Sequence, residues 1–361
     1  MIHYRARILV WAAVMSLLSG IAFASGVIGT EQLAKSLDEL VIGQKQAKQE
    51  LVDLSRRIQT GTRASTKTAM MLVYGPSGMG GRTLFESYAK IIGAPTYLVP
   101  VKLISQADSK PLTDELAKRL KADPTTVVIF KNFELVSTEV LGALLTVADN
   151  NAVGDGARAV KTDRALFGIR TTSGTGFVDK WTLYRKQPPM TPVGFMTASK
   201  TEAIKNLPTP ESLELPKDIP FHVSREELIK DGVPQALLER CEALAPVFPP
   251  SSGEFIDIFI KHFNEAFDKF ATEKRVNLSM SARSSSAMLE AVRANVYHPD
   301  ISHDEIIKAM RSILDDALAD AVLKGKVKPG GSITLVFDPE KLKIKTMCAR
   351  KLKSSKGESL E

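Results

Sequence analysis

The stretch TAMMLVYGPSGMGGRT, residues 68–83, decides the fold of this chain of 361 residues. Its first seven residues are apolar apart from Thr68, as expected for a strand buried on both faces of a sheet. A glycine-rich turn over Gly75–Gly81 follows, and a helical segment over Thr83–Ile92 comes next. A strand, a glycine-rich turn and a helix in this order are the setting of a phosphate-binding P-loop. The backbone of such a turn needs glycines because several φ angles are positive.

Further apolar strands and amphipathic helices alternate after this stretch. Strands are predicted over Thr96–Lys102, Thr125–Phe130 and Ala165–Thr172, with helices over Leu112–Lys121 and Ser137–Asp149 between them. Strands that alternate with helices predict a parallel sheet covered by helices. An earlier helix is predicted over Gln44–Arg57. The expected fold class is therefore α/β.

The second half of the chain changes character. Residues 177–220 contain seven prolines and weak periodicity, which predicts a long and partly irregular excursion. Beyond Pro250, helices are predicted over Glu254–Glu273, Ser281–Ala294 and Ser302–Lys324, the last with a capping box of Ser302 and Glu305. Strands over Ser332–Phe337 and Leu342–Met347 predict a terminal pair. The predicted domains are a large α/β domain over 25–250, a small, mostly helical domain over 251–347, and a basic and polar tail over 348–361.

The N-terminus has the three parts of a secretory signal peptide. Met1–Arg7 is short and basic, Ile8–Ile21 is almost wholly apolar, and Ala22-Phe23-Ala24 places small residues at the cleavage positions. The segment 1–24 is thus predicted to be removed on export, with the periplasm as the expected compartment. An uncleaved membrane anchor and a lumenal protein are the alternatives. The apolar run is short for a transmembrane helix, which needs about 20 residues.

The order of motifs resembles the Clp-type AAA+ ATPases, including the torsins. Val41-Ile42-Gly43-Gln44 resembles the segment that passes over the adenine in that family, and residues 127–134 (VVIFKNFE) resemble the Walker B strand. Thr171–Gly174 resembles the strand end that carries sensor 1, and Leu237–Arg240 resembles the arginine-finger segment. The resemblance covers most of residues 40–340. It implies an AAA+ sandwich domain, a C-terminal lid domain, and assembly into rings through the interface at Arg240.

The residues that carry the chemistry of that family are replaced. The P-loop lysine neutralises phosphate charge and the next hydroxyl binds Mg²⁺, yet Gly81 and Arg82 stand there. A register slipped by one residue would use Arg82 and Thr83 instead. Lys131 and Asn132 stand where the Walker B acids bind Mg²⁺ and activate water, and Glu134 follows two residues later. The positions that the resemblance assigns to a vestigial nucleotide site are Gly43, Gln44, Gly75, Gly78, Gly80, Gly81, Arg82, Thr83, Lys131, Asn132, Glu134, Gly174 at sensor 1 and Asp304 at sensor 2.

These replacements predict a protein without catalytic residues and without a required cofactor. The favoured hypothesis is an exported pseudo-ATPase that serves as a structural or assembly component of an envelope or secretion-type complex. One alternative is a torsin-like or Clp-like ATPase with nonstandard nucleotide binding that acts as a lumenal chaperone, and another is a sensor that binds ATP or ADP without hydrolysis. Expected partners are other proteins, including further copies in a ring or a membrane-associated complex, and not nucleic acid.

Three other features have simpler explanations. The region from Lys102 to Thr125 lacks the aromatic-glycine pore loop of the Clp unfoldases, so substrate threading is not expected. His298, Asp300, His303 and Asp304 are interpreted as a turn that leads into a capped helix rather than as a metal site. The formal net charge of +7 is concentrated near the C-terminus, where a solvated strand and tail are favoured over a lipid-binding surface.

Overall fold

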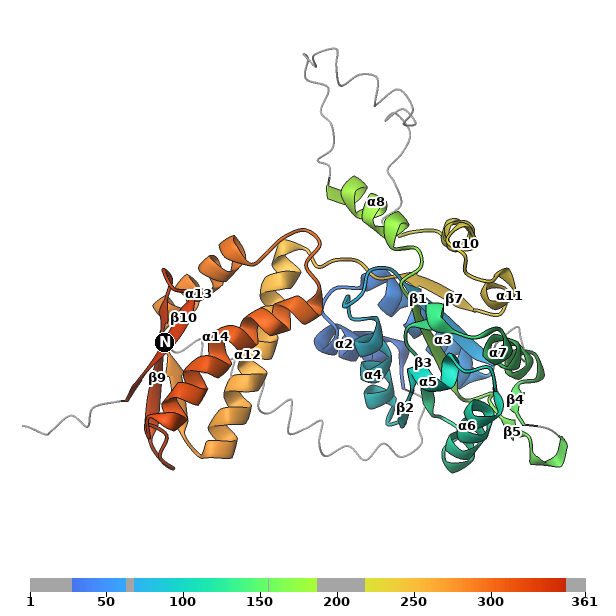
Figure 1. Ribbon diagram of the computed structural model, residues 1–361, viewed down its shortest axis with the longest axis horizontal. Coiled ribbons are helices and arrows are strands. Elements are labelled where there is room, and N and C mark those ends of the chain that lie inside the picture. The colour runs from blue at the N-terminus through green and yellow to red at the C-terminus, as the bar shows by residue number, and fades with distance from the viewer. Residues whose placement is uncertain (1–27, 63–67, 155, 187–217, 349–361) are drawn as a thin grey trace, which may run out of the picture. The chain divides into compact units, whose positions relative to one another are not determined.

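The computed structural model describes residues 28–62, 68–154, 156–186 and 218–348 (Figure 1). The predicted signal peptide, most of the proline-rich excursion and the C-terminal tail lie outside these ranges. The described residues form two compact units. Of the described residues, the first unit contains 28–62, 68–74, 81–154, 156–174 and 218–246, and the second unit contains 75–80, 175–186 and 247–348.

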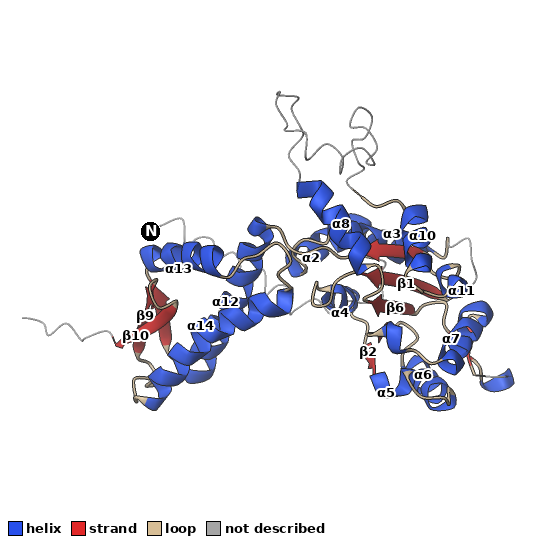
Figure 2. Ribbon diagram, turned by 45° about the horizontal axis from the view of Figure 1, so that its top comes forward, coloured by secondary structure: helices blue, strands red, loops and turns tan. Residues whose placement is uncertain are grey.

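The first unit is built on a parallel sheet of five strands in the order β2-β3-β6-β1-β7. Every residue of β1, β3 and β6 is buried, since helices cover both faces of the sheet (Figure 2). This confirms the expected α/β class and the parallel sheet. The elements are α2 (Thr30–Leu40), α3 (Lys45–Thr60), β1 (Ala69–Tyr74), α4 (Gly81–Ile92), β2 (Thr96–Val99), α5 (Val101–Ile104), α6 (Lys110–Ala122), β3 (Val127–Phe130), η1 (Phe133–Leu135), α7 (Thr138–Asn150), β4 (Ala152–Val153), η2 (Gly156–Arg158), β5 (Val160–Lys161), β6 (Leu166–Thr171), α10 (Phe221–Lys230), α11 (Gln235–Leu238) and β7 (Ala243–Pro246).

The second unit combines helices with a small sheet of order β10-β9-β8. Its elements are α8 (Thr175–Lys186), α12 (Ser252–Lys274), β8 (Asn277–Met280), α13 (Ala282–Asn295), α14 (His303–Leu323), β9 (Ser332–Asp338) and β10 (Lys343–Cys348). The predicted terminal pair is confirmed as the antiparallel pair β9–β10. A third strand, β8, joins it in parallel, which the sequence did not indicate.

Two helices begin with the reciprocal hydrogen bonds of a capping box. The predicted box at the start of α14 is confirmed, because the Glu305 amide donates to Ser302 Oγ at 3.2 Å and the Ser302 amide donates to Glu305 Oε2 at 2.8 Å. A second box joins Ser251 and Glu254 at the start of α12. Both helices therefore have sequence-encoded starting points.

The region predicted as irregular begins with regular structure. Residues Thr175–Lys186 form α8, in which the rings of Phe177 and Trp181 lie 5.9 Å apart. Residues 187–217 lie outside the described ranges, and helix α10 starts directly after Pro220. The predicted irregular region therefore starts too early, because the prolines that suggested it begin only at Pro188, after the end of α8. Among the described residues, none of the helices has the length and apolar character needed to span a bilayer.

Candidate functional site

The glycine-rich turn of residues 75–80 follows β1 and leads into α4, as the sequence predicts. Gly78 and Gly80 have φ angles of 76° and 84°, in the left-handed region that favours glycine. Helix α4 then begins at Gly81, the position of the P-loop lysine in the related family. The turn therefore joins a strand to a helix through left-handed glycines, as the sequence pattern predicts.

The glycine faces of this turn are packed against the start of α14, within the second unit. A Cβ on Gly78 would lie 2.9 Å from Ser302 Cβ and 3.3 Å from Asp304 Oδ2, and a Cβ on Gly80 would lie 3.2 Å from the His303 ring. The His303 amide donates a hydrogen bond of 2.9 Å to the Gly78 carbonyl. Side chains of the protein itself therefore lie against the glycines that would cradle a phosphate.

His303 is the most strongly perturbed group at this contact. Burial lowers its pKa to about 4, and nearby His262 and Lys261 act in the same direction. The acids Asp304 and Glu254 oppose this effect without reversing it. His303 is consequently neutral at physiological pH.

Arg82, the cationic residue next to the turn, forms an ion pair within its own helix. Arg82 Nε lies 2.7 Å from Glu86 Oε1, one turn further along α4, and both side chains are well exposed. Thr83 is also exposed at the start of α4. Arg82 and Thr83 are the two residues that a P-loop register slipped by one residue would use.

The Walker B positions follow β3 at the carboxyl edge of the sheet in the first unit. Lys131 is half-buried and forms no ion pair with any residue that the structure describes. Asn132 has a φ of 57° and precedes the short helix η1. Glu134 lies in η1, where its Oε2 atom receives two long contacts of 3.4 Å, from Thr171 Oγ1 and from the Thr172 amide.

At the sensor 1 position, an aromatic ring occupies the space of a side chain. A Cβ on Gly174 would lie 2.8 Å from the ring of Tyr74 and 3.1 Å from Leu228. The Tyr74 hydroxyl donates a hydrogen bond of 2.7 Å to Ser224, and burial raises the Tyr74 pKa. The Gly174 amide donates to the Asp231 carboxylate. In the first unit, Tyr74, Ser224 and Asp231 therefore surround Gly174 with a ring and hydrogen bonds at this strand end.

The segment that resembles the adenine-covering segment has left-handed residues at Gly43 and Gln44, with φ angles of 73° and 51°. Next to it, Gln46 forms two hydrogen bonds with the backbone of Ile219, of 2.7 Å and 2.9 Å. Sequence reasoning missed Gln46. Its partner lies 173 residues away, and a single glutamine in a helix gives no signal of such a contact.

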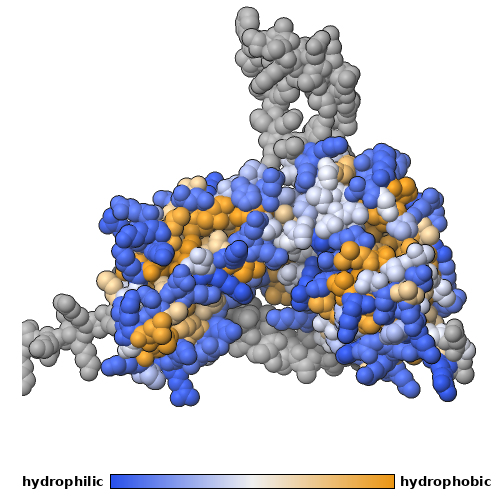
Figure 3. Space-filling view, in the orientation of Figure 1, coloured by the Kyte–Doolittle hydropathy of each residue, from blue (hydrophilic) through white to orange (hydrophobic). Residues whose placement is uncertain are grey.

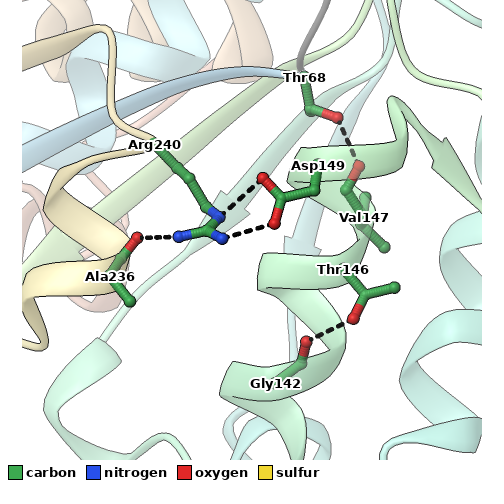
Figure 4. Close-up of polar contacts among 7 residues, drawn as sticks. All are labelled: Thr68, Gly142, Thr146, Val147, Asp149, Ala236 and Arg240. Atoms are coloured by element: carbon green, nitrogen blue, oxygen red, sulfur yellow. Dashed lines mark hydrogen bonds and ion pairs between the residues drawn. The ribbon is translucent and has the colours of Figure 1, made fainter.

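Arg240, the predicted subunit-interface residue, is paired within its own chain (Figure 4). Its Nε and Nη2 atoms lie 3.0 Å and 2.5 Å from the two carboxylate oxygens of Asp149, and Nη1 donates to the Ala236 carbonyl at 2.7 Å. The hydrogen bond with Asp149 raises the pKa of Arg240. Bidentate pairing of this kind fixes the orientation of a guanidinium group.

The structure places the predicted site residues in two groups. Gly75, Gly78, Gly80 and Asp304 belong to the second unit, where Asp304 lies close to Gly78 as the resemblance implies. The other predicted positions belong to the first unit. Within the described ranges, no three histidine, cysteine or acidic side chains gather as a metal site.

The parallel sheet, the glycine-rich turn after β1 and the small α/β second unit together define an AAA+ fold. A solved structure with this fold is a closed-state cryoEM reconstruction of Hsp104 with ATPγS and FITC casein. It matches with a TM-score of 0.62 and 14% identity, over 84% of this chain and 48% of that one.

Curated relatives carry names of the same class. The chaperone protein ClpB of Prochlorococcus marinus is 25% identical over 141 residues, which cover 34% of this chain and 16% of that protein. A homolog of the ClpA ATP-binding subunit from Cyanidium caldarium is 21% identical over 336 residues, covering 86% of this chain and 35% of that protein. ClpB of Meiothermus ruber is 22% identical over 359 residues, covering 91% and 37%. No protein-family model matches the sequence.

The chain is thus related to Clp-type and Hsp104-type AAA+ proteins at low identity. It spans at most 37% of the length of these curated relatives.

Proposed function

We propose that this protein is an exported pseudo-ATPase that uses an AAA+ fold as a structural or assembly component of an envelope or secretion-type protein complex. The observation that carries the proposal is the contact of α14 with the glycine-rich turn. Ser302 and His303 pack against Gly78 and Gly80, two glycines of the turn whose backbone would cradle a phosphate in a P-loop. A phosphate group that approaches these glycines from the side of α14 would therefore require α14 to move away.

Charge and chemistry at the replaced positions support the same conclusion. Lys131 brings a cation to the position of the Mg²⁺-binding acid, and Asp304 brings an anion close to the cradle. Each lost charge-assisted hydrogen bond removes roughly 1.5–3 kcal/mol of binding free energy. Several such losses together exceed what one surviving interaction can offset.

The assembly role is supported by exposed apolar side chains on both units. Large hydrophobic residues with at least 39% exposure are Leu135, Phe221 and Ile229 in the first unit, and Val322, Leu323 and Met347 in the second. On the face shown in Figure 3, apolar patches lie between hydrophilic margins in each unit. Such patches favour protein contacts. The proposed export rests on the sequence of residues 1–24 alone.

The proposal is tested by calorimetry and phosphate release with the protein that starts at Ser25. We expect no heat of binding at millimolar ATP or ADP, with or without Mg²⁺, and no turnover above buffer. Turnover that depends on Mg²⁺ and disappears in the Arg82→Ala or Glu134→Gln variant would contradict the proposal. Nucleotide binding without turnover would favour the alternative hypothesis of a regulatory protein that binds ATP or ADP without hydrolysis.

A restored variant sharpens this test. The substitutions Gly81→Lys, Arg82→Thr, Lys131→Asp and Asn132→Glu return the four lost groups to the P-loop and Walker B positions. We expect this variant to remain inactive, because α14 still packs against the glycine-rich turn. The matched variant adds Ser302→Gly and His303→Gly to open the cradle. Binding that appears only in the second variant identifies the packing as the barrier.

A further inference from the structure

A small cavity lies at the carboxyl edge of the sheet in the first unit, and the proposed function makes no use of it. Its volume is about 250 Å³. Strand β6 and the segment after β3 supply its polar side, and β1 reaches it through Leu72. The carboxyl edge of a parallel sheet is where ligands bind in open α/β folds.

The lining of the cavity is divided between polar and apolar groups. Glu134 is the only charged side chain in it, and three hydroxyl groups accompany the carboxylate, from Thr138, Thr171 and Ser173. The apolar lining residues are Leu72, Phe133, Val136, Leu141, Val233 and Pro234. A ligand that fits this lining carries one polar head group and a short aliphatic stem.

The Glu134 carboxylate has unused capacity to accept hydrogen bonds. Both contacts to Oε2 measure 3.4 Å, which is long for a strong hydrogen bond. Within the part of the chain that the structure describes, no lysine, arginine or histidine forms an ion pair with Glu134. The surrounding residues orient the carboxylate without neutralising it.

We propose that this cavity binds a primary alkylammonium group, with Glu134 as the counter-ion. An ammonium group has three donors and no acceptor. The free carboxylate oxygen of Glu134 and the hydroxyl groups of Thr138 and Ser173 offer acceptors for these donors. The volume suits a chain of a few methylene groups, since it is below the 300–1,000 Å³ that is typical of sites for larger ligands.

A primary alkylammonium group can come from two sources, a free alkylamine or the lysine side chain of a protein. The experiment is amide NMR on the labelled full chain, followed at Thr172, Ser173 and Gly232, with n-butylamine as the first probe. We expect saturable shifts with a dissociation constant on the order of 1 mM, as the limited size of the probe allows. The isosteric alcohol n-butanol should produce no saturable shift.

Variants separate charge recognition from simple filling of the cavity. Glu134→Gln keeps the shape of the side chain, and we expect it to weaken n-butylamine binding at least ten-fold. The matched control is Glu139→Gln, an exposed carboxylate on α7 that is absent from the lining, and its affinity should equal that of the wild type. Val233→Leu narrows the apolar side and should weaken binding while the amide spectrum remains dispersed.

A capped lysine peptide and its norleucine analogue identify the source. Tighter binding of the lysine peptide than of n-butylamine assigns the cavity to a protein side chain, and the reverse order assigns it to a free amine. Equal shifts with n-butanol, unchanged affinity in Glu134→Gln, or no saturable shift with either amine would overturn the proposal. None of these outcomes depends on whether ATP binds.

Discussion

Gly174 shows what the structure adds to an interpretation based on the sequence. Its φ is 80°, and the ring of Tyr74 lies where its side chain would begin. The family resemblance predicts only that a polar residue is missing there. The structure adds the reason that none fits, because Tyr74 and Leu228 already fill the space.

A polar side chain at position 174 should therefore destabilise the first unit. We expect Gly174→Ser to lower the free energy of unfolding by about 2 kcal/mol or more, from overpacking and from the positive φ together. Urea unfolding followed by circular dichroism measures the change. The control is Gly142→Ala on α7, where a Cβ meets no atom within 4 Å, and it should leave stability unchanged or raise it by roughly 0.5–1 kcal/mol.

The Arg240–Asp149 pair gives a second prediction at this scale. A double-mutant cycle with Arg240→Ala and Asp149→Ala should show a coupling free energy of about 0.5–1 kcal/mol, because the pair is bidentate and only partly exposed. The exposed pair of Arg225 and Glu239, joined at 3.1 Å, should couple more weakly. A coupling near zero, with a change of assembly state in Arg240→Ala, would instead favour the predicted subunit interface.

At the scale of elements, the sequence predicts those that are long or continuously apolar. Strands β1, β3 and β6 are apolar throughout and buried, and helices α12 and α14 carry capping boxes. Strand β7, with the sequence ALAP, and strand β8, with NLSM, were missed. Each has four residues and is held by a parallel partner distant in the sequence, β1 for β7 and β9 for β8. Such strands are set by tertiary pairing rather than by local pattern.

The candidate site also has features that the sequence predicts and features that it does not. Glycine spacing predicts the turn of residues 75–80, and the resemblance places Asp304 near it. The sequence does not show that Ser302 and His303 pack on the turn, since this contact joins segments more than 200 residues apart. The cavity beside Glu134 is also invisible in the sequence, because its lining comes from four separate segments.

The packing of α14 on the glycine-rich turn can be tested with two glycines that have the same φ angle. Gly78 and Gly330 both have a φ of 76° and both lie in the second unit. A Cβ on Gly78 would lie 2.9 Å from Ser302, whereas a Cβ on Gly330 meets nothing within 4 Å. We expect Gly78→Ala to cost about 1–3 kcal/mol more than Gly330→Ala, because only Gly78 adds overpacking to backbone strain.

The measurement is thermal unfolding of the second unit in both variants. Equal shifts of the transition would mean that α14 does not press on the turn in solution. The glycine faces would then be open to a ligand, and the proposal of a blocked cradle would lose its main support.

At the scale of the whole molecule, two compact units allow two unfolding transitions. Trp181 lies in α8 of the second unit, and the only other tryptophan of the chain is Trp11 in the predicted signal peptide. In a Trp11→Phe variant, tryptophan fluorescence therefore reports on the second unit, while circular dichroism reports on the helices of both. The two signals distinguish effects on one unit from effects on the whole chain.

Acid should destabilise the second unit selectively through His303. Its pKa is about 4 in the folded protein and 6.5 in its ordinary state. Between these values the unfolded chain binds a proton that the folded chain does not, so stability rises with pH from about 4 to 6.5 and is level above. We expect a loss on the order of 1–3 kcal/mol from pH 7 to pH 4, seen as a lower midpoint of urea unfolding by Trp181 fluorescence.

The matched variant is His303→Asn, which keeps a polar side chain against Gly80 but does not titrate in this range. Its Trp181 transition should depend less on pH than that of the wild type, by the amount assigned to His303. His222→Asn serves as the control, because His222 is exposed on α10 of the first unit and should leave the Trp181 transition unchanged. If the wild type and His303→Asn lose stability in parallel, the burial of His303 against the glycine-rich turn does not persist in solution, and α14 leaves the turn free.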